Sequence, residues 1–184
     1  MKLNDLKLQA GDIGLSTSNS LTSKIIKFFT SWLTSNAKKS HAFICIGDNL
    51  IIEASGKIRV NDISKYYNET VDIYRIPLND ADRKNLKLRI LQETNRGYGW
   101  LKLPLFLADG VLTKVSLLFG NKNPVFFFTK YFGISSFRVC SQLVVWGIHK
   151  FTEYRFRKEE DYIVNWKTVS PDYLEDLLFQ EFQN

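Results

Sequence analysis

Short apolar runs separated by turn-forming residues dominate the first half of the chain. Residues 41–46 and 50–54 have the length and composition of strands, and Gly47, Asp48 and Asn49 between them favour a tight turn. We therefore predict a β-hairpin here. Further strands are predicted at 11–15, 57–60 and 70–76.

Helical spacing of apolar residues predicts four helices among and after these strands, so the expected fold class is α+β. The first three helices are predicted at 20–34, at 81–94 with Asn79 as N-cap, and at 136–151. A C-terminal helix is predicted from Asp172, preceded by Val169, Ser170 and Pro171 as its start signal.

Residues 101–135 are apolar and irregular, with Pro104 and Pro124 as helix breakers, and we interpret them as an insertion in a single domain spanning 1–184. One interpretation makes this insertion a hydrophobic lid, a lipid contact or a partner surface. The other makes it ordinary core helices.

The pairing of the hairpin decides which side chains share a face, because neighbouring residues in a strand point to opposite sides. A three-residue loop, 47–49, gathers the apolar residues on one face and leaves His41 and Glu53 on the other, roughly 7 Å apart on the diagonal. A two-residue turn at 47–48 would separate His41 from Glu53 and mix the faces, so we predict the longer loop. The predicted pairs are Ile46 with Leu50, Ile44 with Ile52, Ala42 with Ala54, and Phe43 with Glu53.

The sequence has no phosphate-binding glycine loop, paired CxxC motif or HExxH motif, so neither a metal nor a cofactor is expected. The remaining candidate for chemistry is Cys140. Cys140 lies at or near the start of an apolar helix, where free N–H groups stabilise a thiolate. Cys45 is about 13 Å along the strand from His41 and is expected in the core. His149 falls on the opposite side of the helix from Cys140, so His41 is the general-base candidate, with Glu53 as its orienting group.

A nucleophilic cysteine with a histidine base would carry out acyl transfer, attacking an amide or ester carbonyl. The alternative explanation for Cys140 is a buried structural cysteine, which is common for this residue type. Spacing alone leaves the two alternatives open.

The chain carries 25 Lys and Arg against 19 Asp and Glu, a net charge of +6, which favours an anionic cell wall or membrane surface as partner. Nucleic acid is disfavoured because Lys24 and Lys27 form no extended basic stripe. Asp5 and Gln9 interrupt the apolar stretch that a secretory signal requires, so we expect a cytoplasmic protein, or one that reaches the envelope by another route, such as in a phage virion. The oligomeric state is left open.

Six short motifs, taken in order, resemble the circularly permuted NlpC-like papain-fold hydrolases; the YiiX-like proteins are the nearest group, and the lecithin:retinol acyltransferase-like enzymes are relatives. The motifs are Gly11-Asp12-Ile13, Ser40-His41-Ala42-Phe43-Ile44, Ile52-Glu53-Ala54, Tyr98-Gly99-Trp100, Arg138-Val139-Cys140-Ser141-Gln142-Leu143-Val144, and Val169-Ser170-Pro171-Asp172-Tyr173-Leu174.

This resemblance implies a permuted papain-like fold, a short antiparallel sheet or half-barrel packed on the helix that carries the nucleophile. It implies a catalytic triad of Cys140, His41 and Glu53, with Tyr98 close to the substrate. Gln142 stands where relatives often have an acidic residue, and the insertion has no obvious counterpart.

Three alternative functions are therefore considered for this protein. The first is a cysteine amidase or peptidase acting on cell-wall peptides or similar short-peptide amides. The second is a lipid or fatty-acyl amidase, thioesterase or acyltransferase that uses the insertion as its acyl site. The third is an inactive binding or structural module.

Overall fold

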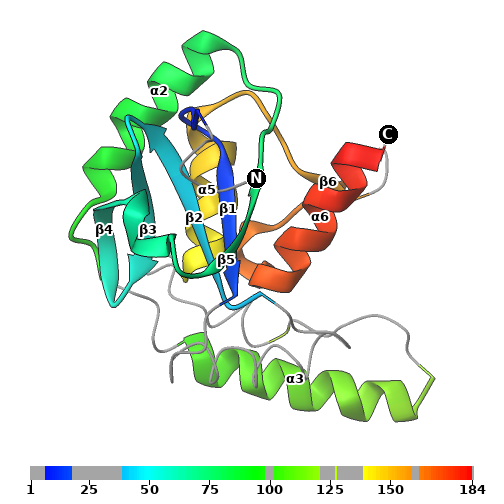
Figure 1. The fold of residues 1–184 in the computed structure, drawn as a ribbon. Helices are drawn as coiled ribbons and strands as arrows, with labels where there is room; N and C mark the ends of the chain where they lie inside the picture. Colours follow the sequence, from blue (N-terminus) through cyan, green and yellow to red (C-terminus); the bar gives the residue numbers. More distant parts are fainter. Residues whose placement is uncertain are drawn as a thin grey trace.

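The computed structural model describes residues 7–17, 39–97, 102–120, 127, 139–158 and 162–183. In these ranges the fold is α+β, as predicted, with one five-stranded antiparallel sheet and four α-helices (Figure 1). The predicted helix at 20–34 and Tyr98 lie outside the described residues. No helix in the described ranges is both long enough and apolar enough to cross a membrane.

The sheet has the strand order β4-β3-β2-β1-β5, and each predicted strand is present within a few residues of its expected bounds. The strands are β1 (Ile13–Thr17), β2 (His41–Gly47), β3 (Leu50–Ser55), β4 (Lys57–Asp62) and β5 (Thr70–Tyr74); a separate two-stranded ribbon pairs β6 (Arg157–Lys158) with β7 (Tyr162–Ile163).

Three of the described helices follow the predicted pattern: α2 (Asp80–Ile90), α5 (Cys140–Phe151) and α6 (Pro171–Gln183). The helix α3 (Lys102–Leu118) lies in the insertion that was predicted to be irregular; Pro104 falls in its first turn, where a proline is tolerated, and does not break it. Short 3-10 turns are η2 (Ile63–Tyr66), η3 (Leu91–Glu93) and η4 (Trp166–Thr168). Asn79 caps α2 by accepting a hydrogen bond from the Asp82 N–H, as its side-chain chemistry predicts. The helix α5 begins at Cys140 and not near Ser136 as predicted, because Val139 has an extended backbone.

The two faces of the sheet bury different side chains. Ala42, Ile44 and Ile52 belong to the main core, where they meet apolar residues of α2, α5 and α6. Phe43 and Ile51 belong to a smaller core on the opposite face, covered by η2. The predicted division of the hairpin into an apolar face and a face with His41 and Glu53 is therefore confirmed.

The hairpin turn differs from the prediction in one detail. Phe43 pairs with Glu53 as predicted, but Gly47 pairs with Leu50, and a bulge between Cys45 and Gly47 takes up the extra residue. The loop is therefore the two residues 48–49, both with left-handed backbones (φ 56° and 59°), which is the geometry of tight hairpin turns. Ile46 is the extra residue at this bulge and has no partner in β3, so the predicted pairing of Ile46 with Leu50 is wrong.

Gly14 allows the second core to close. A Cβ placed on Gly14 would lie 2.0 Å from Cζ of Phe43, so the phenyl ring occupies the space that any side chain would need. The other side of Phe43 stacks on Tyr66 of η2, with ring centroids 4.7 Å apart. This close approach fixes the position of η2 over the sheet.

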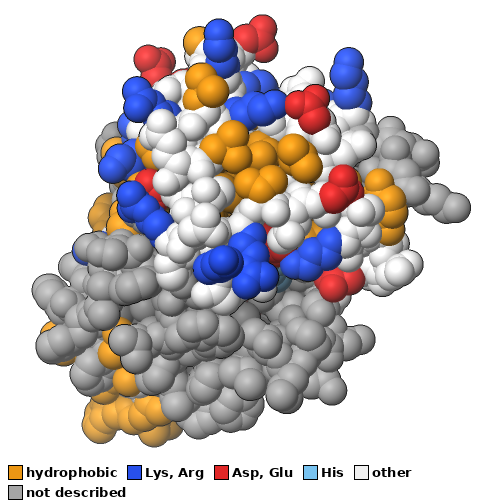
Figure 2. Space-filling model, turned by 90° about the vertical axis from the view of Figure 1, so that its left-hand side faces the viewer, with side chains coloured by type: hydrophobic (Ala, Val, Ile, Leu, Met, Phe, Trp, Pro, Cys, Tyr) orange, Lys and Arg blue, Asp and Glu red, His pale blue; other side chains and the backbone are white. Residues whose placement is uncertain are grey.

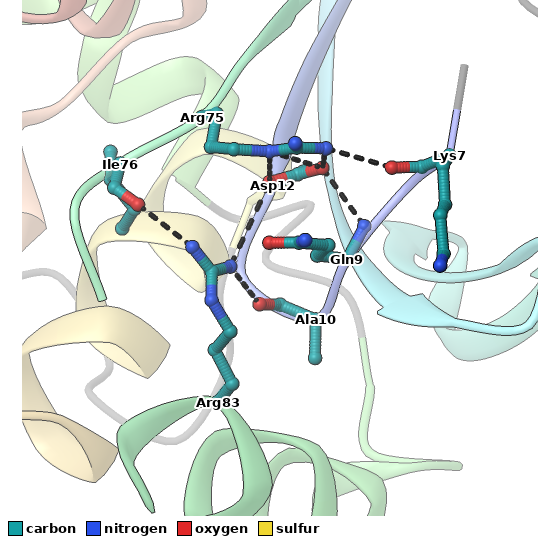
Figure 3. Close-up of polar contacts among 7 residues, drawn as sticks. All are labelled: Lys7, Gln9, Ala10, Asp12, Arg75, Ile76 and Arg83. Carbon is teal, nitrogen blue, oxygen red and sulfur yellow. Dashed lines mark hydrogen bonds and ion pairs between the residues drawn. The ribbon is translucent and has the colours of Figure 1, made fainter. Parts of the chain in front are cut away.

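Asp12 anchors the start of β1, and this gives a structural reason for the Gly11-Asp12-Ile13 motif (Figure 3). Its carboxylate is fully buried, accepts hydrogen bonds from Arg75 at 2.8–3.3 Å, and lies 3.8 Å from Arg83. Arg83 also donates to the carbonyl of Ala10 at 2.6 Å. The cluster joins β1, the end of β5 and α2, and it lies apart from His41 and Cys140.

Candidate active site

A buried carboxylate organises the second face of the sheet. Glu53 of β3 is fully buried and accepts four side-chain hydrogen bonds, each of 2.5 Å, from His41, Asn61, Lys65 and Tyr66. Burial alone would raise the pKa of Glu53, but the hydrogen bonds and the cationic charge of His41 outweigh it and lower this pKa well below its ordinary value. Glu53 is therefore a permanent anion at neutral pH.

His41 stands between this anion and Cys140. Its Nε2 is the atom bonded to Glu53, which leaves Nδ1 for the thiol. Burial lowers the pKa of His41, but the charge of a Cys140 thiolate, a hydrogen bond to Cys140 and the contact with Glu53 together raise it to about 10. The predicted group of Cys140, His41 and Glu53 is thus brought together in space.

The helix start positions Cys140. Cys140 is the first residue of α5 and is almost fully buried, at 1% exposure. The first N–H groups of a helix have no partner within the helix, and they create a positive potential there. A thiolate, or the oxyanion of a reacting carbonyl, would be stabilised at this position.

Two neighbours of Cys140 hold the helix start against the segment before α6. Ser141 donates a hydrogen bond to the carbonyl of Val169 at 2.7 Å, and the Gln142 amide donates to the carbonyl of Lys167 at 2.6 Å. An ionised acid at position 142 could not donate this second bond. The Gln142 amide therefore has a structural role in fixing α5.

The start of β2 is fixed by α6. The backbone N–H of Lys39 donates to Asp172 at 2.9 Å, and the Lys39 ammonium forms ion pairs with Asp72 and Glu175. Asp172 is the second residue of α6, so the Val169–Leu174 motif determines where the strand carrying His41 begins.

The remaining candidates take other positions. Cys45 is buried in the second core, where burial raises the pKa of its thiol, as expected for a core cysteine. His149 accepts a hydrogen bond from the Phe156 N–H at 2.9 Å, and burial lowers its pKa to about 4. Neither residue takes part in the Cys140 site, as predicted.

Sequence reasoning missed three of the four donors to Glu53. Asn61 could have been found from strand alternation, because it pairs with Ile51 on the face that carries Glu53. Lys65 and Tyr66 lie on η2, whose docking over the sheet no local pattern indicates. The Tyr66 ring also stacks on the His41 ring, with centroids 6.3 Å apart and planes at 13°.

A buried hydroxyl lies beside His41 and was also missed. Ser16 of β1 pairs directly with His41 in the sheet and is fully buried. Within the described part of the chain, its Oγ has no hydrogen-bond partner. Unpaired buried hydroxyls are uncommon because they lose their bonds to water.

Comparisons with known proteins leave the family open. No protein-family model matches the chain, and a search of curated proteins finds no similar sequence.

Proposed function

We propose that the protein is a cysteine hydrolase, an amidase or peptidase that cleaves short-peptide amides, such as those of a cell wall, through an acyl-enzyme. The observation that carries this proposal is the chain of contacts from Glu53 through His41 to Cys140 at a helix start. A cysteine, a base and an orienting carboxylate in this order are the elements of nucleophilic acyl transfer.

The arrangement also supports membership of the permuted NlpC-like papain-fold group, in which the histidine precedes the cysteine in sequence. An antiparallel sheet carries His41 and Glu53, and the helix that begins with Cys140 packs on that sheet. Family membership remains part of the proposal.

In the proposed reaction, the thiolate of Cys140 attacks the substrate carbonyl carbon, and the carbonyl electron pair moves to oxygen as an oxyanion. The N–H of Cys140 is placed to stabilise that oxyanion. When the carbon–nitrogen bond breaks, the protonated His41 gives its proton to the leaving amine and a thioester remains. Water then attacks the thioester carbon and His41 accepts a proton from it. The carbon–sulfur bond breaks, which releases the carboxylic acid and restores the Cys140 thiolate beside the protonated His41. Glu53 stabilises the imidazolium throughout.

The proposal is tested by measuring the pH dependence of iodoacetamide labelling in the folded protein. Mass spectrometry distinguishes the peptides of Cys140 and Cys45. We expect Cys140 to label faster than Cys45, whose burial favours the unreactive neutral thiol. We expect His41→Ala to slow Cys140 labelling at neutral pH by at least about tenfold, because the thiolate loses its cationic partner.

His149→Gln is the matched control, because it removes the other histidine of the chain without touching the site. It should leave the labelling rate of Cys140 unchanged. Slow labelling of Cys140 that is the same in wild type and His41→Ala would overturn the proposal.

A second candidate function, acyl transfer on lipid substrates, is favoured by the burial pattern of α3, in which polar side chains are buried and apolar side chains are exposed. Asp109 and Thr113 of this helix are buried, whereas Val115, Leu118 and the following Phe119 are exposed, the last two by 85% and 86%. In Figure 1, α3 lies below the end of the sheet at which β1 ends and β2 begins. An exposed apolar helix face beside a site is suited to a lipid surface.

Vesicle co-sedimentation tests this second candidate. Vesicles of phosphatidylglycerol and phosphatidylcholine should bind the wild type, and Leu118→Ser with Phe119→Ser should abolish binding. Leu88→Ser, which removes an exposed leucine of α2, is the control and should bind normally. Equal binding by all variants, or no binding by the wild type, would remove this candidate.

A further inference from the structure

Two cations of β4 share a face of the sheet with the proposed active site. Ile58 packs in the main core, so the residues on either side of it, Lys57 and Arg59, point to the opposite face. Asn61 continues that side of the strand, and its amide donates to Glu53 at 2.5 Å. Lys57 and Arg59 therefore lie on the same side as the Glu53 carboxylate.

The sheet register gives their position relative to the site. Arg59 pairs directly with Glu53, and Lys57 pairs with Ser55. Neighbouring strands are about 4.8 Å apart, so the backbone of β4 is about 10 Å from β2, the strand of His41. Extended Lys and Arg side chains cover much of that distance. Figure 2 views the side of the molecule on which β4 lies in Figure 1 and shows several Lys and Arg side chains close together in the lower part of the described surface.

Among the residues that the structure describes, these two charges have no acidic partner. Among the described residues, Glu53 pairs with His41 and Lys65, and Glu93 pairs with Arg96. No carboxylate in the described ranges forms an ion pair with Lys57 or Arg59, and the Arg59 side chain is exposed. Both cations are therefore available to a solute.

We propose that Lys57 and Arg59 bind a carboxylate of the substrate, so that the enzyme selects acyl groups carrying a negative charge near the scissile bond. This inference rests on the proposed function, because it assumes that Cys140 is the nucleophile. A guanidinium binds a carboxylate through two parallel hydrogen bonds, and a neighbouring ammonium adds attraction. Neutral substrates of equal size gain neither interaction.

Two alkylating reagents of nearly equal size, iodoacetate and iodoacetamide, test the inference. They differ in charge and react with the same thiolate, so the ratio of their rates at Cys140 cancels any change in thiolate population. We expect this ratio to exceed that of free cysteine. At about 10 Å each cation should contribute between about twofold and tenfold, and 1 M salt should reduce the effect.

The double variant Lys57→Gln with Arg59→Gln should lower the ratio. The control, Lys84→Gln with Arg89→Gln, removes two exposed cations from α2, which packs in the main core on the face of the sheet opposite Glu53, and should leave the ratio unchanged. Thermal unfolding of each variant confirms that it is folded.

The outcomes separate the two proposals. Efficient labelling of Cys140 with equal ratios in the wild type and the β4 double variant would overturn the carboxylate site and leave the cysteine hydrolase intact. Failure of both reagents to label Cys140 in the folded wild type would overturn the proposed function, and the carboxylate site with it.

Discussion

The protonation of His41 gives the sharpest physical test of the site. Its pKa rises from 6.5 to about 10, which corresponds to about 5 kcal/mol of preference for the charged imidazolium at about 1.4 kcal/mol per pKa unit. Burial opposes this rise, and contacts with Cys140 and Glu53 produce it. Removing those contacts one at a time should therefore lower the pKa in steps.

Glu53→Gln keeps the shape of the side chain but removes its charge. A hydrogen-bonded carboxylate raises a partner's pKa by about 1 to 3 units, so the pKa of His41 should fall to between about 7 and 9. Cys140→Ala should lower it further, because the interactions with Cys140 are the larger contributions. In the double variant only burial remains, and the pKa should fall below about 6.5.

Imidazole resonances followed by two-dimensional NMR measure these values, and the chain has only two histidines to assign. His149 serves as the internal reference, because its pKa is lowered to about 4 and should not move in any of these variants. A wild-type His41 that titrates near 6.5, or one unaffected by Glu53→Gln, would refute the arrangement of Cys140, His41 and Glu53.

Four further predictions concern stability, measured by chemical or thermal unfolding. Gly14→Ala should destabilise the protein by about 1–3 kcal/mol or more, because its Cβ would collide with Phe43; an unchanged midpoint would contradict this packing. Ser16→Ala should stabilise by up to about 1 kcal/mol, since it removes an unpaired buried hydroxyl; a loss of stability would show that the hydroxyl is bonded. Gln142→Glu should destabilise by about 1–3 kcal/mol through a lost donor, and wild-type stability would argue against that bond. Because folding lowers the pKa of Glu53, the ionised carboxylate adds to the free energy of unfolding above about pH 4.5, and this contribution is lost as pH falls through the folded-state pKa. Glu53→Gln should therefore make the loss of stability at acidic pH less steep. An unchanged acid dependence would contradict the pairing of Glu53 with His41.

Local chemistry along the chain was sufficient to predict the hairpin and the positions of His41 and Glu53. Alternation of side chains fixes the two faces of a strand, and one wholly apolar face selects the pairing of Phe43 with Glu53. The same kind of argument placed Cys140 at or near the start of its helix and Asn79 at the cap of another. These features depend on neighbours close in sequence, which is why the sequence alone determined them.

The tertiary structure decided which distant groups meet. Lys65 and Tyr66 reach Glu53 only because η2 docks over the second core, and this docking requires the space that Gly14 leaves for an aromatic ring. The apolar exposure of α3 likewise contradicts what its composition would suggest for a core helix. Contacts of this kind depend on how elements pack in three dimensions, and packing is a property of the whole chain that no local pattern encodes.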